Sequence, residues 1–284
     1  MPKGRTLKSK LQCADDRIKI TILTIRGLVD EGIEMPISSS KPYVVSIIPA
    51  RSGSKGIRDK NLQIIGGKTL LEWTILASIK SEQIDRTIVS TDSEMYAELC
   101  RNAGAEVPFI RPADISGDKA TDFQFISHAM DYLESEGKIS DLLVHLRPTT
   151  PLRDPETIDK AVNEFKENRK RFSSLRSVHE MGESAYKTFE ISENGNLQTV
   201  FTKINEIDSS NNARQNFPKT FVANGYVDVL NCEYISDKSQ IHGDNVKAFL
   251  TEPVLEVDTL WDLELIQMQV ISNPNLLKRI QKDS

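Results

Sequence analysis

From Tyr43 onward, short runs rich in β-branched residues alternate with segments whose apolar residues recur at helical spacing. Strands are expected at 43–50, 86–92, 106–112, 141–148 and 173–178, and helices at 69–80, 93–104, 121–137 and 154–170. Near-continuous apolar strands that alternate with helices are typical of a parallel sheet covered on both faces. The pattern therefore predicts an α/β fold in which a mostly parallel sheet is flanked by helices.

The alternation breaks between residues 183 and 222, where short strands, turns and a polar loop replace the next strand and helix. A strand over 221–231 resumes the sheet, and two short strands are expected within 246–258. An amphipathic helix over 259–271 follows them. We therefore expect one large domain over 43–284 that carries a small β-rich insertion.

The first 42 residues differ from the rest of the chain in charge. They hold eight Lys and Arg against five Asp and Glu, whereas the whole chain has 36 Lys and Arg against 41 Asp and Glu and a net charge of −5. We interpret 1–42 as a basic N-terminal extension of unknown role, and favour a solvated tail over a binder of anions. The acidic charge of the whole chain argues against nucleic acid as a general partner.

Composition also predicts a cytoplasmic protein without a membrane partner. The most apolar early stretch, residues 18–29, is interrupted by Lys19 and Arg26. It is also shorter than the roughly 20 residues that a membrane span needs. The three cysteines are far apart in the sequence, which favours a reducing compartment over a disulfide framework.

The loop directly after the first expected strand, residues 51–61, combines glycines with cations. Gly53 and Gly56 allow backbone N–H groups to approach a polyanion closely. The cations of this loop are Arg51, Lys55, Arg58 and Lys60. Ligands of open α/β sheets bind at the carboxyl ends of strands, which is where this loop lies. The loop therefore predicts a triphosphate site, which we favour over a solvated basic turn.

Two common phosphate-binding patterns are absent from this region. The loop is not GxGxxG, because it has only two glycines. The residues Gly67-Lys68-Thr69 resemble the end of a Walker A loop, but Leu62 stands where that pattern needs glycine. We expect a turn here, followed by a helix that Thr69 caps.

Two carboxylates, Glu256 and Asp258, lie at the end of the second strand expected within 246–258. Residues two apart on a strand point to the same face, so both carboxylates could bind one Mg²⁺ together with phosphate oxygens. The alternative is that Asp258 caps the helix that follows.

Two further motifs end other expected strands. Asp92 either faces the same cleft as Arg51 or caps the helix that starts at Ser93. Arg147 or Arg153 could hold an anionic substrate, and a purely structural turn is the equal alternative.

Taken together, these segments resemble the acylneuraminate cytidylyltransferases, the CMP-sialic acid synthetases. The resemblance covers roughly residues 44–270 and rests on IIPARSGSKGIRDKN, VSTDSE, RPADISGDKATD, LRPTTPLRDP, ARQNFPKTFVANGYVDV and LEVDTLWDLE, in the order of the family. It implies a Rossmann-like fold of the GT-A type, with an insertion at about 170–222 that dimerises and reaches the active site of the partner. The implied homodimer would transfer CMP from CTP to a nine-carbon 2-keto acid sugar, with Mg²⁺ as cofactor and pyrophosphate as product.

The resemblance also implies a role for each matched residue. It assigns the triphosphate to Arg51, Ser54, Lys55 and Lys60, the cytidine to Asn61 and Arg111, the sugar to Arg147, Arg214, Gln215 and Asn224, and Mg²⁺ to Glu256 and Asp258. Arg51, Lys60 and Asp258 are the expected catalytic residues.

The chain departs from the family pattern at a few positions. Arg147 stands where Gln is more frequent, Glu256 where Asp is more frequent, and Asp122 where some members have Ser. The sugar therefore stays open among N-acetylneuraminic, legionaminic and pseudaminic acids. Two alternatives also stay open: a CMP-Kdo-type cytidylyltransferase, which the RPTTPLR turn disfavours, and a non-catalytic homologue that binds sugar nucleotides.

Overall fold

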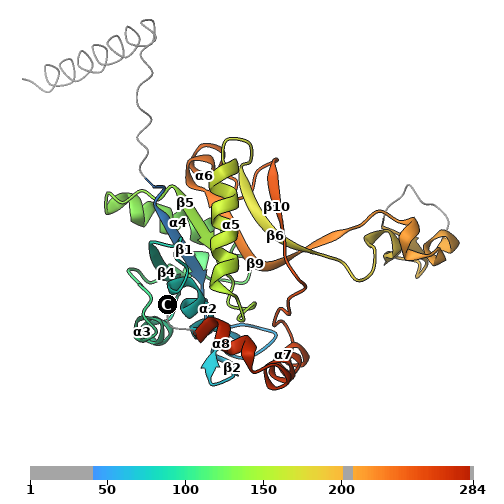
Figure 1. The fold of residues 1–284 in the computed structure, drawn as a ribbon, viewed down its shortest axis with the longest axis horizontal. Helices are drawn as coiled ribbons and strands as arrows, with labels where there is room; N and C mark the ends of the chain where they lie inside the picture. Colours follow the sequence, from blue (N-terminus) through green and yellow to red (C-terminus); the bar gives the residue numbers. More distant parts are fainter. Residues whose placement is uncertain (1–40, 201–206, 282–284) are drawn as a thin grey trace, which may run out of the picture. The chain divides into compact units, whose positions relative to one another are not determined.

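The computed structural model describes residues 41–200 and 207–281 (Figure 1). The proposed basic extension up to residue 40, and the apolar stretch at 18–29 within it, lie outside the described residues. None of the described helices is both long enough and apolar enough to cross a membrane.

Six strands form the central sheet: β1 (Val44–Pro49), β4 (Arg86–Ser90), β5 (Leu142–His145), β6 (Ser174–Glu180), β9 (Phe221–Asn231) and β10 (Val246–Leu250). Their order across the sheet is β10-β6-β9-β5-β1-β4. β9 runs antiparallel to its neighbours β5 and β6, whereas the other neighbouring pairs are parallel. The predicted mostly parallel sheet is thereby confirmed.

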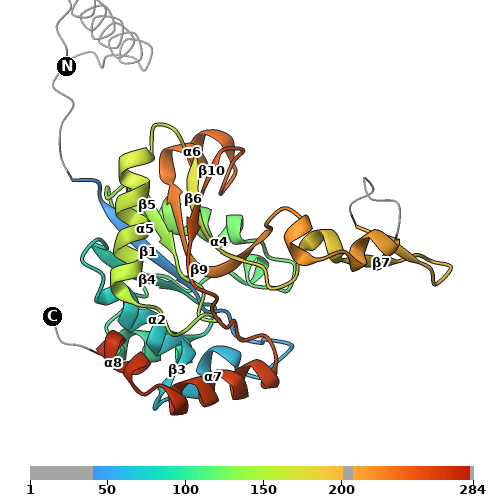
Figure 2. The same ribbon diagram turned by 45° about the vertical axis from the view of Figure 1, so that its right-hand side comes forward.

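Helices cover both faces of this sheet (Figures 1 and 2). Val44 and Ile48 of β1 join a core cluster with residues of α2 (Leu70–Ile79), α3 (Glu94–Asn102), α5 (Pro155–Asn168) and α8 (Asn275–Gln281). Val45 and Ile47 join a second cluster with residues of α4 (Asp122–Ser135) and α6 (Cys232–Lys238). Successive strand residues point to opposite faces, so the two clusters lie on the two sides of the sheet.

The chain after β1 is shaped by local turn and cap chemistry. The short 3₁₀ helix η1 (Lys60–Leu62) leads into a hairpin of β2 (Ile64–Ile65) and β3 (Lys68–Thr69). Gly66 and Gly67 form its turn with φ of 55° and 87°, a region that favours glycine. Thr69 then caps α2, since its side chain accepts from the Glu72 N–H while the Glu72 carboxylate accepts from the Thr69 N–H. The expected turn and cap are both confirmed.

Two strands expected from the sequence are wrong. Residues 106–112 make only isolated bridges beside β4, with η2 (Ala113–Ile115) following them. Residues 252–258 form no strand after the edge strand β10. Both segments contain a proline, Pro108 or Pro253, which has no N–H to donate to a strand ladder.

The segment between β6 and β9 forms no strand of the main sheet. It contains η3 (Ala185–Lys187), the antiparallel pair β7 (Phe189–Ile191) and β8 (Leu197–Thr199), η4 (Ile207–Asn211) and η5 (Arg214–Asn216). In both views this hairpin lies apart from the six-stranded sheet (Figures 1 and 2). Because β6 belongs to the sheet, the insertion begins after residue 180 and not at about 170.

Candidate active site

The loop after β1 is held in place by Asp92, which follows β4. One carboxylate oxygen of Asp92 accepts from the Ser52 N–H at 2.7 Å and the other accepts from the Ser52 hydroxyl at 3.1 Å. Ser93 caps α3, so the idea that Asp92 caps this helix is wrong. At the far end of the loop the Asn61 amide donates to the Arg51 carbonyl at 3.2 Å. The loop is thus anchored at both ends, and Gly53 turns it with φ of 74°.

A cavity of about 470 Å³ opens beside this loop, at the carboxyl ends of β1 and β5. Among its lining residues are eight that the sequence resemblance assigns to the site: Arg51, Ser54, Lys55, Lys60, Asn61, Arg111, Arg147 and Asp258. Five of these eight are cationic: three belong to the loop itself, and Arg111 and Arg147 come from segments farther along the chain. A cavity with this charge suits a polyanion such as a triphosphate.

Acidic side chains pair with the cations of the loop. Asp118 accepts from Lys55 at 2.5 Å and from Arg51 at 2.9 Å. These hydrogen bonds, that of Lys55 first, lower the pKa of the Asp118 carboxyl. Lys60 donates to Asp258 at 2.9 Å. A phosphate group that enters the cavity must therefore replace carboxylate partners on these three cations.

Arg111 forms the inner wall of the cavity and is only 4% exposed. Its guanidinium donates to the Ser90 hydroxyl at 2.9 Å and to the Ser90 carbonyl at 2.5 Å, and it lies over the Phe125 ring. Burial lowers the pKa of Arg111 to about 10, which leaves it cationic at neutral pH.

Arg147 lies between two carboxylates. It donates to Asp122 at 2.8 Å and to Asp228 at 2.9 Å. Burial acts to lower the pKa of Arg147, but the two carboxylates outweigh it and the pKa is raised. Arg147 is therefore a fixed cation at the wall of the cavity.

Arg153 has a structural role and does not line this cavity. It is completely buried and donates to the carbonyls of Arg147, Gly225 and Tyr226 and to the Thr74 hydroxyl. Burial lowers its pKa to about 9. Of the two arginines that the sequence left open, the structure therefore places only Arg147 at the cavity.

Glu256 and Asp258 flank Val257, whose N–H donates to the Thr149 carbonyl at 2.7 Å. Glu256 accepts from the Thr149 hydroxyl at 2.8 Å, and Asp258 pairs with Lys60. A Cβ added at Gly56 would lie 3.0 Å from the Asp258 carbonyl, so glycine there lets the loop over 51–61 (the phosphate loop of the sequence prediction) approach this segment. Thr259 caps α7 (Leu260–Ser272), so the alternative that Asp258 is this cap is wrong.

Because residues 252–258 form no strand, the expectation that Glu256 and Asp258 share one strand face is wrong, and only Asp258 lines the cavity. Both side chains are nevertheless carboxylates, the kind of ligand that suits Mg²⁺. Mg²⁺ is usually held by one or two carboxylates, with waters and substrate phosphates as its other ligands. Within 41–200 and 207–281, no group of three or more His, Cys, Asp or Glu side chains is arranged to hold a metal ion. Glu256 and Asp258 would therefore be the contribution of this chain to a site that phosphate oxygens complete.

Three residues assigned to the sugar do not line this cavity. Asn224 is buried, and its amide donates to the Thr251 hydroxyl at 2.7 Å and contacts His179 Nδ1 at 3.2 Å. Arg214 and Gln215 line a separate cavity of about 340 Å³ on the insertion, where Arg214 donates to Glu180 at 3.0 Å. A single chain does not bring these three residues to the phosphate loop.

Two acidic residues of the site were not found from the sequence, Asp118 and Asp228. Asp118 gives no signal, since it is an acid in a polar loop. Asp228 does give one, because it is the lone charge within the apolar run of β9. A buried carboxylate in such a strand needs a partner, which is a reason to search for a cation nearby.

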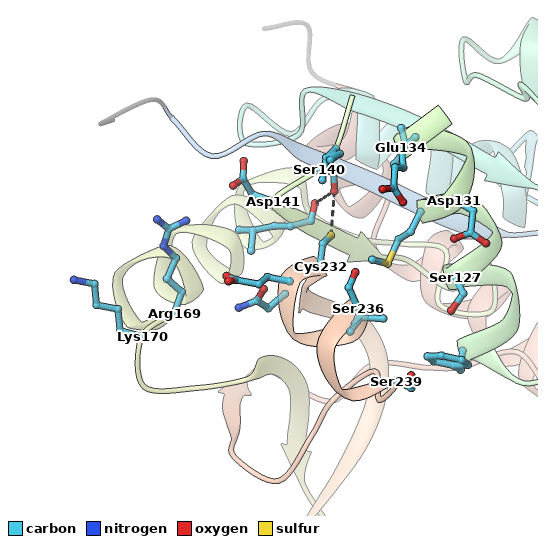
Figure 3. A pocket seen from close by; sticks show the side chains of 18 residues that line it. Ser127, Asp131, Glu134, Ser140, Asp141, Arg169, Lys170, Cys232, Ser236 and Ser239 are labelled. Atoms are coloured by element: carbon cyan, nitrogen blue, oxygen red, sulfur yellow. Dashed lines mark hydrogen bonds between the residues drawn. The ribbon is translucent and has the colours of Figure 1, made fainter. Parts of the chain in front are cut away.

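A larger cavity, of about 850 Å³, lies at the amino end of β5 (Figure 3). It has no glycine loop, and Figure 3 shows Arg169 and Lys170 on the side opposite Asp131 and Glu134. Burial raises the pKa of the Cys232 thiol at its floor to about 12, so this thiol is not activated. The smaller cavity at the phosphate loop therefore remains the candidate active site.

The fold and the cationic cavity define an α/β protein with a glycine-containing, cationic loop after its first strand. Residues 45–218 match the sequence model of one family, described as cytidylyltransferase, and the chain belongs to that family.

Two relatives of named function each match part of the chain. An N-acylneuraminate cytidylyltransferase of Escherichia coli O18:K1:H7 is 42% identical over 120 residues, which are 42% of this chain and 27% of the relative. A CMP-N,N'-diacetyllegionaminic acid synthase of Legionella pneumophila is 33% identical over 135 residues, 48% of this chain and 58% of the relative. The chain thus matches between a quarter and three fifths of the length of these relatives.

A solved structure shows the same fold. CMP:2-keto-3-deoxy-manno-octonic acid synthetase complexed with CTP aligns with a TM-score of 0.60 at 15% identity, over 81% of this chain and 99% of that one. This likeness supports the α/β fold predicted from the sequence.

Proposed function

We propose that the protein transfers CMP from CTP to the anomeric hydroxyl of a nonulosonic acid, a nine-carbon 2-keto acid sugar, and releases pyrophosphate. The observation that carries this proposal is the cavity beside the glycine loop, which is lined by Arg51, Lys60 and Arg111. The chain that contains this cavity belongs to the cytidylyltransferase family. The named relatives act on sugars of this class.

The chemistry needs positioning and charge neutralisation more than a covalent intermediate. The anomeric oxygen bonds to the α-phosphorus, the proton of the hydroxyl passes to solvent water, and the bond from that phosphorus to the bridging oxygen breaks, so that pyrophosphate leaves. Arg51 and Lys60 stabilise the charge that grows on the pyrophosphate. Arg111 and Asn61 lie at the inner end of the cavity and are proposed to hold the cytidine.

Glu256 and Asp258 are proposed to hold Mg²⁺, which when bound would polarise the phosphate oxygens. Lys60 pairs with Asp258 and lies in the same cavity, so it is placed to exchange this carboxylate for a phosphate oxygen. Lys60 would then balance part of the negative charge of the triphosphate.

A homodimer is proposed as the active form. The insertion carries exposed apolar residues, which mark interaction surfaces in many proteins: Ile191, Leu197, Val200 and Ile207. It also carries Arg214 and Gln215, away from the cavity of their own chain. In a dimer these two residues would contact the sugar bound in the active site of the partner. The cytoplasmic location remains a prediction.

The dimer can be tested by complementation. Arg51→Ala and Arg214→Ala variants are each expected to lose most of their turnover, because each lacks a residue of every active site. Mixed dimers of the two would contain one site with both arginines, so exchange of subunits should restore turnover. If the mixture stays inactive although subunits exchange, Arg214 does not act across a dimer.

Two alternatives are kept. A CMP-Kdo-type enzyme has the same fold, and the structural likeness at 15% identity does not separate the two activities. A non-catalytic homologue would bind CTP without turnover.

Pyrophosphate release from CTP and Mg²⁺ should be measured with N-acetylneuraminic, legionaminic and pseudaminic acids and with Kdo, using UTP and ATP as nucleotide controls. Release of pyrophosphate with CTP and one nonulosonic acid supports the proposal. Release with Kdo alone, or no release with any of the sugars, contradicts it.

A further inference from the structure

Asp228 is a buried acid at the centre of the sheet, outside the set of residues that the family pattern assigns. It is 1% exposed and lies in register with His145 on β5 and Arg176 on β6. The three side chains share one face of the sheet because cross-strand partners point the same way. A carboxylate at this depth is stable only beside cations or hydrogen-bond donors.

The cation nearest to Asp228 is Arg147, at 2.9 Å, followed by Arg176 at 3.6 Å. His145 and His242 lie at 3.9 and 3.8 Å, but burial lowers the pKa of both rings, so they are neutral near pH 7. The contact with Asp228 is thus a nearly dry ion pair on the inner side of Arg147. Removing one partner of such a pair leaves the other charge buried and unpaired.

The second carboxylate that pairs with Arg147, that of Asp122, is partly exposed to solvent. Asp122 is the first residue of α4, its side chain is 43% exposed, and it accepts from the other terminal nitrogen of Arg147 at 2.8 Å. Exposed ion pairs contribute little because water competes for both charges. Asp122 is therefore the exchangeable partner of Arg147, whereas Asp228 is the permanent one.

We propose that Asp228 is a positioning residue that holds Arg147 for the carboxylate of the sugar acid, and that this carboxylate takes the place of Asp122. The inference rests on the proposed function and adds the residue that sets the sugar side of the cavity. A guanidinium whose inner edge is fixed presents its other donors in a constant direction, which suits a planar carboxylate.

The test separates the two substrates by steady-state kinetics. Asp228→Asn is expected to raise KM for the sugar acid about tenfold or more, because Arg147 loses its buried anchor, while KM for CTP changes less than about twofold. Asp122→Asn is expected to lower KM for the sugar acid about two- to fivefold, because a competing carboxylate is removed. Asp131→Asn, on the same helix but outside this cavity, is the matched control.

A double variant tests whether Asp228 acts through Arg147. In the Arg147→Gln background, Asp228→Asn should add no further increase in KM for the sugar acid, since the group that it positions is gone. If Asp228→Asn alone fails to fold, two other measurements decide the question. One compares KM for the sugar acid between the double variant and Arg147→Gln, and the other measures it in the single Asp122→Asn variant.

The outcomes separate this inference from the proposed function. Turnover by the unmodified protein, with KM for the sugar acid unchanged in Asp228→Asn or raised in Asp122→Asn, overturns the inference alone. An equal rise in both KM values shows a general structural role of Asp228 and also overturns it. Absence of turnover with any sugar acid overturns the proposed function and the inference with it.

Discussion

Replacing Arg51 by alanine tests the phosphate loop most directly. In the folded protein, Arg51 makes a half-exposed pair with Asp118 at 2.9 Å. Such pairs contribute about 0.2–1 kcal/mol, so Arg51→Ala should lower the free energy of unfolding by less than about 1 kcal/mol. In the proposed reaction the same cation would face the charge that grows on pyrophosphate in the transition state. Loss of one such preorganised contact is worth about 2.7–4 kcal/mol, so kcat should fall about 10²- to 10³-fold.

The matched control for this prediction lies in the same loop. Arg58 carries the same charge, but its side chain is 98% exposed and does not line the cavity. Arg58→Ala should therefore change kcat less than about twofold, because a contact screened by water contributes little. Both variants are measured by pyrophosphate release at saturating CTP and by urea denaturation. The reasoning is refuted if Arg51→Ala keeps near-normal turnover, or if Arg58→Ala loses as much activity as Arg51→Ala.

Three further predictions follow from the contacts of the site. Asp258→Asn should raise the Mg²⁺ concentration needed for half-maximal turnover about tenfold or more, because one of two carboxylate ligands is lost; an unchanged Mg²⁺ titration would contradict the metal assignment. Asp118→Asn should lower Kd for CTP about two- to fivefold in a calorimetric titration, because the acid that competes for Arg51 and Lys55 is neutralised; weaker CTP binding would show instead that Asp118 assists the nucleotide. Arg153→Met should lower the free energy of unfolding by about 3 kcal/mol or more in urea denaturation, because buried carbonyls lose their donor; a loss below about 1 kcal/mol would show that water or another donor replaces it.

Much of the fold follows from patterns within a few residues of each other. The apolar runs of the strands and the helical spacing between them depend on which faces are buried, and a single sequence shows this. Thr69 as a helix cap and the glycine turn at 66–67 depend on local hydrogen bonds and φ angles, so they too were predicted correctly. The strand expected at 106–112 and the second strand expected within 246–258 were predicted wrongly, because a strand needs a neighbour and Pro108 and Pro253 cannot complete the ladder.

The candidate site also combines features that the sequence shows with contacts that depend on the fold. The glycine loop with several cations after the first strand, and the spacing of Glu256 and Asp258, can be read from the sequence alone. The contacts that these groups make depend on the tertiary structure. Asp118 reaches Arg51 across 67 residues of chain, and Asp228 lies beside Arg147 because β9 runs antiparallel to β5 in a particular register. The positions of charged residues can be read from the sequence. The partner of a buried charge depends on strand order and register, which no local pattern contains.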